Sequence, residues 1–256
     1  MPKSNCDHRS KISKEMHVSP RSLTQPMPQL EVIATETMAT KVYQQLREAI
    51  MSGSFAAGQP LSLRGVAEAV GLSTMPVRAA LTRLRAEGAL VDGPSRGLMV
   101  PPMTLDLLEE LRDVRIALEG CVAERAAARM TNDDVAAVQR IFDEMDAHVE
   151  ADDARAYLRC NFAFHTSIYR HGASEMTLAT IQNMWMRIGP FLNMVAPDVA
   201  HMRVSMQAHR QIIDALWKHD GAAAREGIAK DIRDAASDLE ARLRSQEPRM
   251  RRHAQS

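Results

Sequence analysis

The fold is decided by residues 58–100, which read GQPLSLRGVAEAVGLSTMPVRAALTRLRAEGALVDGPSRGLMV. Apolar residues recur at helical spacing over 63–70 and again over 73–87, and Gly71 and Gly88 stand where each helix should end. Residues 89–101 then alternate around Gly93-Pro94, which predicts two short strands joined by a turn. A further helical pattern runs from Thr40 to Gly53. Three helices followed by a hairpin predict a winged helix-turn-helix.

The polar side chains of residues 73–87 indicate what this unit binds. Those opposite the apolar stripe are Ser73, Thr74, Arg78, Arg83 and Arg85. Arginine reads guanine edges or holds phosphates, while hydroxyls and a helix N-terminus suit phosphates. A solvated charged face is the alternative. Arg64 in the preceding helix and Arg96 at the hairpin tip would flank the same side, which favours contact with nucleic acid.

Beyond Pro101-Pro102 the helical pattern is almost continuous and contains no strand pattern. It predicts helices over 104–130, from Thr131 onward with a capping box to Asp134, over 153–170, over 199–218 and over 222–244. The Gly189-Pro190 step is expected to interrupt one more. The predicted fold class is therefore mainly α, with a winged helix-turn-helix over 35–102 and an all-α antiparallel bundle over 103–244. Residues 1–34 are expected to form a disordered arm and 245–256 a basic tail.

The formal charge of zero is a sum over unlike parts. Residues 1–102 carry 12 basic and 8 acidic side chains (+4), residues 103–243 carry 16 and 23 (−7), and residues 244–256 carry 4 and 1 (+3). Such segregation indicates separate tasks for the two halves. Phe, Tyr and Trp together number 10, too few for a repeated stacking platform for single-stranded nucleic acid.

Cysteine usage and hydropathy indicate the compartment. Cys6, Cys121 and Cys160 have no disulfide-like or metal-ligand spacing, which fits a reducing environment. No run approaches the roughly 20 apolar residues of a membrane span, and the N-terminus has no signal-peptide core. We expect a cytoplasmic protein.

The N-terminal motifs carry a resemblance to a known family. The segments that match it, in order and spacing, are Gly58–Leu61, Leu63-Arg64, Gly71–Ser73, Pro76–Leu84, Glu87-Gly88 and Arg96-Gly97. The region resembles the DNA-binding domain of the GntR family of bacterial transcription regulators. The resemblance implies operator contacts from Arg64, Ser73, Thr74, Met75, Arg78, Arg96 and Gly97. Thr74 and Met75 stand where many members have Arg and Thr, so the operator should differ from those of relatives. Since one helix-turn-helix reads few base pairs, we expect a homodimer on a palindromic operator.

Four polar residues of the helical region form a candidate metal set. Asn161 and His165 lie one helical turn apart, while His209 and Asp231 occur among apolar residues at core spacing. Two imidazoles, a carboxylate and an amide oxygen are plausible ligands for a divalent cation in a bundle interior. A core histidine is, however, more often simply hydrogen-bonded, so the residues alone leave both interpretations open.

The helical region is also similar to the FCD effector domain of the FadR-like GntR subgroup. The matching positions are Arg115, Glu119, Phe164-His165 and the run from His209 to Asp220. Metal-binding members have Asp where Asn161 stands and His where Asp231 stands. Compared with those members, this chain lacks a negative charge at position 161 and has one at position 231, so the summed formal charge of the four candidate ligands is the same. The resemblance implies Zn²⁺, Ni²⁺ or Mn²⁺ held by Asn161, His165, His209 and Asp231; alternatively, Asp231 pairs with a protonated histidine and no metal binds.

Arg115 falls among apolar residues, where a permanent cation needs a partner. In the resembling family this arginine holds a carboxylate effector. An internal salt bridge to Glu119 is the alternative, and Arg187 is a second candidate for the same pocket.

These expectations combine into a ligand-responsive transcription repressor, released from its operator by a small organic acid. One alternative is a DNA-binding regulator without metal or ligand. Another is a metal-dependent hydrolase, but the sequence has no nucleophile elbow, phosphate loop or His-Glu-x-x-His motif. We therefore predict that the chain is not an enzyme.

Overall fold

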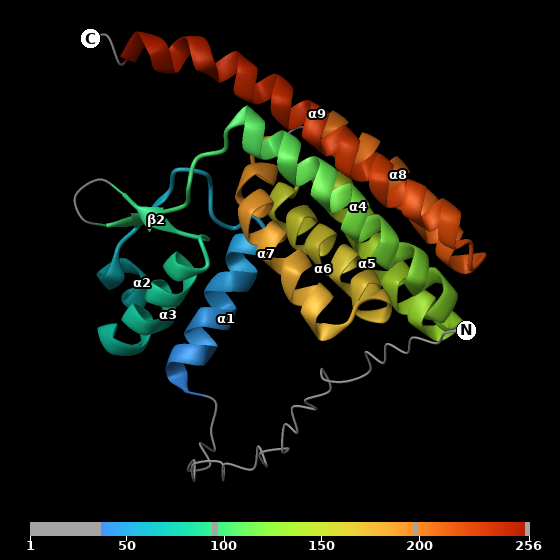
Figure 1. Ribbon diagram of the computed structural model, residues 1–256, viewed down its shortest axis with the longest axis horizontal. Coiled ribbons are helices and arrows are strands. Elements are labelled where there is room, and N and C mark those ends of the chain that lie inside the picture. The colour runs from blue at the N-terminus through green and yellow to red at the C-terminus, as the bar shows by residue number, and fades with distance from the viewer. Residues whose placement is uncertain (1–36, 94–96, 197–198, 254–256) are drawn as a thin grey trace, which may run out of the picture. The chain divides into compact units, whose positions relative to one another are not determined.

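A computed structural model describes residues 37–93, 97–196 and 199–253, with side chains described as far as Ser245. Within these ranges the fold is mainly α, as predicted, with one small sheet (Figure 1). No helix in the described ranges is long and apolar enough to cross a membrane. The expected arm at 1–34 lies outside the described residues.

The N-terminal part is a winged helix-turn-helix. Its elements are α1 (Met38–Met51), β1 (Pro60–Leu61), α2 (Leu63–Val70), α3 (Thr74–Ala86), β2 (Val91–Asp92) and β3 (Leu98–Met99). Gly71 ends α2 in the left-handed conformation (φ 66°), which glycine adopts without strain. Ser73 occupies the N-cap position of α3, but its side chain makes no capping hydrogen bond. The apolar stripe of α3, including Val77 and Leu84, is fully buried against α1.

The small sheet has one strand more than the sequence pattern predicts. Its order is β1-β3-β2 with both pairs antiparallel, and Pro60 and Leu61 pair with Met99 and Leu98. The sequence pattern predicts only the two hairpin strands and no strand before Leu63. A two-residue strand has no periodicity of its own, and its pairing with β3 exists only in the folded chain.

The remainder is an antiparallel helical domain. Its helices are α4 (Leu105–Arg129), α5 (Asn132–Glu150), α6 (Ala154–Gly172), α7 (Glu175–Leu192), α8 (Val199–Trp217) and α9 (Gly221–His253). Helix starts follow the predicted caps: Thr104 and Asp153 each accept a backbone N–H, and Thr131 and Asp134 form a complete capping box.

Two boundaries differ from the expectation. Pro190 does not interrupt α7: the helix continues through it and ends two residues later at Leu192. Helix α9 does not stop near residue 244 but continues to His253, so the backbone of part of the expected tail is helical.

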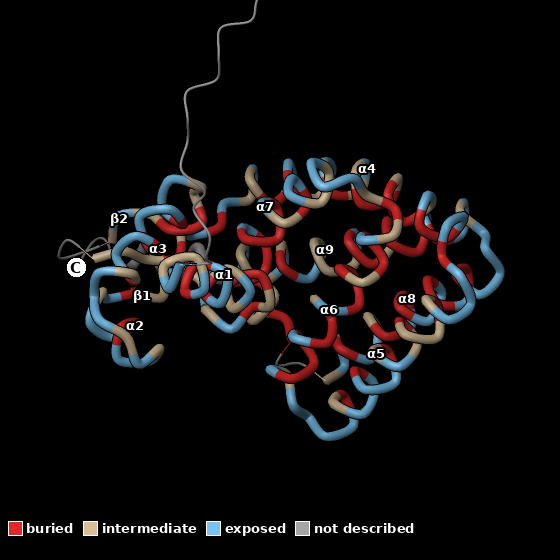
Figure 2. The backbone as a smooth tube through the Cα atoms, turned by 90° about the horizontal axis from the view of Figure 1, so that it is seen from below, coloured by how far each residue is buried: buried red, intermediate tan, exposed pale blue. Residues whose placement is uncertain are grey.

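Helix α6 occupies the middle of the helical domain. It packs on α4 and α5 and also contacts α7, while α9 lies along α4 and α8. The buried residues of these helices face one another and the exposed ones face outward (Figure 2). Seven side chains buried among the described residues are polar or charged, and four of them, His165, His209, Glu119 and Arg115, are each at most 6% exposed. Burial of such groups requires hydrogen-bond or ion-pair partners, and the contacts among these side chains form a site inside the helical domain, called the inner site below.

Candidate functional site

The outer face of α3 presents the predicted DNA-reading side chains to solvent. Ser73, Thr74, Met75 and Arg78 are all exposed, Met75 at 73%. Arg64 on α2 is exposed as well. A groove of about 270 Å³ between α3 and the sheet is lined by Arg78 and by Gly97 among others, which brings helix and wing together. Arg96 lies outside the described residues.

Two other arginines of α3 serve the protein itself. Arg83 stacks on the ring of Tyr43, 3.7 Å from its centre, and its Nε donates to Glu87 at 3.0 Å. Arg85 pairs with Asp92 on β2 at 2.9 Å and so ties the wing to α3. Because Arg83 and Arg85 are paired within the protein, the candidate DNA-reading face of α3 consists of Arg78 and the residues at the start of the helix.

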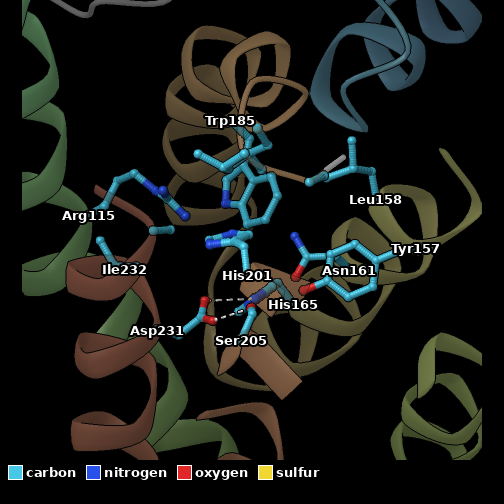
Figure 3. Close-up of a pocket in the computed structure, with 14 residues that line it drawn as sticks. Arg115, Tyr157, Leu158, Asn161, His165, Trp185, His201, Ser205, Asp231 and Ile232 are labelled. Carbon is cyan, nitrogen blue, oxygen red and sulfur yellow. Dashed lines mark hydrogen bonds and ion pairs between the residues drawn. The ribbon is translucent and has the colours of Figure 1, made fainter. Parts of the chain in front are cut away.

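A second site lies inside the helical domain (Figure 3). Its cavity is lined by Arg115 of α4, by residues of α6 including Tyr157, Asn161 and His165, by Trp185 of α7, by His201 and Ser205 of α8, and by Asp231 of α9. The structure thus brings three of the four predicted metal ligands to one cavity wall. The fourth, His209, lies directly behind that wall.

The donor atoms of His165, His209 and Asp231 form a compact triangle. The two Nε2 atoms are 3.3 Å apart, and Asp231 presents Oδ2 to His165 and Oδ1 to His209, each at 3.3 Å. A tetrahedral Zn²⁺ with ligand distances of about 2.0–2.1 Å separates its ligand atoms by roughly 3.3 Å. The two Nε2 atoms stand at this spacing, and a single oxygen of Asp231 lies within 4.8 Å of both, so a modest rotation of the carboxylate would complete a tetrahedral set. Asn161 precedes His165 by one helical turn and lines the same cavity.

Hydrogen bonds behind the triangle orient the His165 ring. The Tyr169 hydroxyl donates to Glu119 Oε2 at 2.7 Å and lies 3.2 Å from His165 Nδ1. Because the hydroxyl proton is already engaged, its oxygen accepts from Nδ1–H. In the neutral ring the lone pair is then on Nε2, which faces the triangle. This assignment follows from the hydrogen-bond network. Such a partner behind a histidine is typical of metal ligands.

The surroundings of His209 and Asp231 set the protonation state of each side chain. Burial, with a smaller contribution from His165, lowers the pKa of His209 to about 4 although Asp231 acts in the opposite direction. The imidazole is therefore neutral at neutral pH, the form that binds cations. Burial would raise the pKa of Asp231, but His209, His165 and Arg115 outweigh it and hold that pKa well below its usual range. Ser205 Oγ donates to Asp231 Oδ1 at 3.2 Å.

Arg115 is paired within the protein. Its Nε and Nη2 donate to the two oxygens of Glu119 at 2.7 and 3.3 Å, and its guanidinium lies 5.0 Å from the centre of the Trp185 ring. Glu119 is completely buried and also accepts from Trp185 Nε1 at 3.2 Å. These two bonds use two of the five guanidinium N–H groups, and Arg115 still lines the cavity. The internal salt bridge is thus present in this structure.

The cavity is small and has a definite outer wall. Its volume of about 30 Å³ has room for about one water or ion, not for a multi-carbon acid. His201 lines this cavity and also an outer groove of about 470 Å³, so its ring separates the two spaces. Its Nδ1 is hydrogen-bonded to Asp238 on α9. A larger ligand would need this wall to move.

Arg187 does not share the pocket of Arg115 in this structure. Its side chain is exposed and is absent from the cavity lining. A Cβ built on Gly88 would lie 2.8 Å from a guanidinium nitrogen of Arg187, which places this arginine beside the turn after α3. Arg187 follows Trp185 by two positions, which lie on opposite sides of a helix, so in this structure its side chain points away from the cavity that Trp185 lines.

Helix α7 connects the two sites. Leu192 lines the inner cavity, and the next residue, Asn193, donates its side-chain amide to the backbone carbonyls of Gly53 and, at 3.4 Å, Phe55. Gly189 lies so close to the carbonyls of Ile50 and Met51 that any Cβ there would clash. One turn of α7 therefore contacts both the inner cavity and the end of α1.

Several lining residues were not singled out from the sequence: His201, Ser205, Tyr157 and Trp185. A signal existed for two of them. His201, Ser205 and His209 are spaced i, i+4 and i+8, so they share one face of α8. The roles of Tyr157 and Trp185 depend on how α6 and α7 are rotated against each other, which no local pattern specifies.

Comparison with known proteins agrees with this architecture. A family model described as bacterial regulatory proteins, gntR family, matches residues 38–100, and the FCD domain model matches residues 110–234. A winged helix-turn-helix joined to such a helical domain defines the class of DNA-binding transcription regulators. The chain belongs to the GntR family, in its FadR-like group with an FCD domain.

Individual relatives have low sequence identity to this chain, but the matches cover most of both chains. The chain is 26% identical to the HTH-type transcriptional regulator McbR of Escherichia coli over 196 residues, covering 76% of this chain and 89% of that one. It is 25% identical to the gluconate operon transcriptional repressor of Bacillus subtilis over 221 residues, covering 81% and 88%. The solved structure of E. coli McbR/YncC superposes with a TM-score of 0.76 at 24% identity, covering 81% of this chain and 99% of that one. This last likeness confirms the fold.

The family settles the broad functional class. Its members and the relatives above are transcription regulators, so the chain is a regulator and not an enzyme. The hydrolase alternative is thereby set aside. The histidine–aspartate triangle needs an explanation other than catalysis.

Proposed function

We propose that this protein is a homodimeric repressor that binds a palindromic operator and is released by a small carboxylate held in the inner cavity of the helical domain. The observation that carries the proposal is the junction at Leu192 and Asn193. Leu192 lines the cavity, while Asn193 bonds to the segment that follows α1 of the winged helix. A ligand that displaces this turn would act on the DNA-binding part directly, because the two contacts belong to neighbouring residues.

The cavity would hold a divalent cation of the Zn²⁺, Ni²⁺ or Mn²⁺ type. His165, His209 and Asp231 supply two imidazole nitrogens and one carboxylate within 4.8 Å of one another, and Asn161 supplies an amide oxygen nearby. The cation would provide a positive centre that attracts an anionic ligand. Ser205 and Tyr169 would hold Asp231 and His165 in place through the hydrogen bonds described above.

The effector would be a small carboxylate. With a divalent cation the triangle carries one net positive charge, since Asp231 supplies the only negative charge among these three ligands. Arg115 lines the adjoining wall and has N–H groups beyond those bonded to Glu119. The present volume of about 30 Å³ requires the His201 wall to swing toward the outer groove when such an acid enters. Size and charge together favour short acids.

Operator recognition would rest on a few placed side chains. Arg78 is exposed at the groove between α3 and the wing, and Ser73 and Thr74 lie at the N-terminus of α3, where backbone N–H groups suit phosphates. The balance of +4 over residues 1–102 is modest. Affinity would therefore depend on these positions and on two half-sites rather than on bulk electrostatics.

The test combines an operator with the ligand. An operator selected from a random DNA pool is titrated by fluorescence anisotropy, with and without Zn²⁺ and with a panel of short carboxylates. We expect at least one acid to weaken operator binding in wild type and to raise the melting temperature. His165→Ala should abolish both effects, whereas His171→Ala, on the same helix but outside the cavity lining, should leave them intact. Acids without effect on either measurement would overturn the proposal.

A second candidate is a regulator that needs neither metal nor ligand. The observation that favours it is the closed network in which Asp231 itself contacts both histidines and Ser205. Such contacts hold Asp231 near both rings without a cation if one imidazole is protonated, although His209 Nδ1 has no hydrogen-bond partner. Elemental analysis of protein purified without a metal column separates the two: one bound cation per chain, lost in His165→Ala, supports the first candidate, and metal-free protein with full operator affinity supports the second.

A further inference from the structure

A second group of ligand-type side chains lies away from the inner cavity, between α5 and α6. Glu144 and His148 stand one turn apart on α5, and Cys160 comes from α6, which packs along α5. One donor atom from each residue lies within 4.8 Å of the other two. The carboxylate of Glu144 is 3.9 Å from Nε2 of His148. A carboxylate, an imidazole and a thiol therefore converge at one point of the surface.

The surroundings make this point accessible from outside. Glu144 is exposed, His148 is partly exposed, and Cys160 forms the floor with 9% exposure. Cys160 directly precedes Asn161, but the two side chains point about 100° apart around α6. None of the three residues lines the inner cavity. The cluster is thus separate from the histidine–aspartate triangle, although both share α6.

The donor types select a class of cation. Sulfur, imidazole nitrogen and carboxylate oxygen together form a three-residue set typical of Zn²⁺, with a fourth position left for water. A thiolate ligand disfavours Mg²⁺ and Ca²⁺, which take oxygen ligands. In a zinc tetrahedron sulfur and nitrogen lie roughly 3.5 Å apart. The donor atoms lie within 4.8 Å of one another, so sulfur and nitrogen need to approach by at most about 1 Å. Rotation of the Glu144 and His148 side chains allows this approach, because neither side chain is held in the core.

Other uses of Cys160 fit the structure less well. Burial, with a smaller contribution from Glu144, raises the pKa of its thiol, so the thiol is not an activated nucleophile and would release its proton only when a cation binds. The other free thiol of the described residues, Cys121, lies on α4 and belongs to no such cluster there. A cation is the partner that uses all three groups at once.

We propose that Glu144, His148 and Cys160 form a second, surface metal site for a soft divalent cation of the Zn²⁺ class. Occupancy would link α5 to α6 across their contact. Since α6 also carries Asn161 and His165, the site would hold in place the helix that supplies half of the inner set. The inference stands whether or not the inner cavity binds metal.

Cobalt distinguishes the two sites by their chemistry. Co²⁺ replaces Zn²⁺ in tetrahedral sites, and a cobalt–thiolate bond gives an intense near-ultraviolet charge-transfer band that nitrogen and oxygen ligands do not give. The full-length protein, stripped of metal and reduced, is titrated with Co²⁺ alone. We expect a thiolate band that saturates at one equivalent beyond any inner-site binding and that is lost on addition of Zn²⁺.

Variants assign the band to this cluster. Cys160→Ser should remove it, and His148→Gln, a substitution at a partly exposed position, should weaken Co²⁺ binding at least tenfold. Cys121→Ser and Cys6→Ser are the matched thiol controls and should retain the band. His165→Ala disables only the inner set and should also retain it, so failure of the inner-site proposal leaves this result unchanged. A wild-type titration without a thiolate band, or a band that persists in Cys160→Ser, would overturn the proposal.

Discussion

Replacement of Glu119 by glutamine tests how the inner site is held together. Glu119 is completely buried and accepts from Arg115, Tyr169 and Trp185, which come from three helices. Glu119→Gln keeps the shape but removes the charge that balances Arg115, which is only 6% exposed. Removing one partner of a buried ion pair typically costs about 3–5 kcal/mol, because the remaining charge stays buried without compensation.

The magnitude follows from the number of bonds affected. Glutamine offers one acceptor oxygen where Glu119 offers two, and its amide directs N–H groups toward the Arg115 guanidinium. We expect a loss of about 3 kcal/mol in the free energy of unfolding by urea. At roughly 2–4 °C per kcal/mol for a protein of this size, the melting temperature should fall by about 6–12 °C.

The chain supplies a matched control on the same helix. Glu124 pairs with Arg225 at 3.1 Å, but both side chains are about half exposed. Glu124→Gln should therefore cost no more than about 1 kcal/mol. The double variant Arg115→Met with Glu119→Gln should regain much of the lost stability, because no charge then remains buried. Equal losses at Glu119 and Glu124, or a double variant less stable than Glu119→Gln alone, would refute the reasoning.

Three further outcomes are expected. Arg78→Ala should reduce operator affinity at least tenfold in anisotropy titrations with no change in melting temperature; Arg85→Ala, which loses only its bond to Asp92, should bind within a few-fold of wild type, and equal losses would contradict the assigned reading face. His201→Ala should open the cavity wall and speed the removal of bound metal by a chelator, with an unchanged rate arguing against a gate. Thr131→Ala should cost about 1 kcal/mol of unfolding free energy through loss of the capping box, and a cost near zero would mean that α5 starts without it.

Helix boundaries were the part of the fold most open to prediction from sequence. Gly71, Thr104, Thr131 and Asp153 end or begin helices where their types predict, because caps act on backbone groups within three residues. One failure involves a distant partner, because strand β1 exists through its pairing with β3. The other is Pro190, which lies within the last turn of α7 instead of interrupting the helix.

The candidate site divides along the same line. Helical spacing placed Asn161 and His165 on one face and His209, Asp231 and Arg115 among core residues, and the resemblance to FCD domains supported this set and implied a carboxylate-binding role for Arg115. The position of His201 depends on Asp238 from α9, and the orientation of His165 depends on Tyr169 and Glu119 from two helices. These partners are set by the packing of the bundle, so no local pattern specifies them. Arg187 marks the limit of such reasoning, since its partner is the turn at Gly88 rather than the cavity.

Asp231 stands where the metal-binding members of the resembling family have histidine, and this difference changes the contacts of the site as well as its charge. An aspartate on α9 reaches both histidines with its two oxygens, at 3.3 Å each, which a histidine at that position could not do with a single lone pair. Asp231 can therefore pair with a protonated histidine when no cation is bound, and it is also a suitable cation ligand. Without a cation His209 Nδ1 has no hydrogen-bond partner, so one buried polar atom stays unsatisfied. If the proposed cation binds, we expect the domain to be folded both with and without it, and the proposed response to depend on which anion approaches the cation.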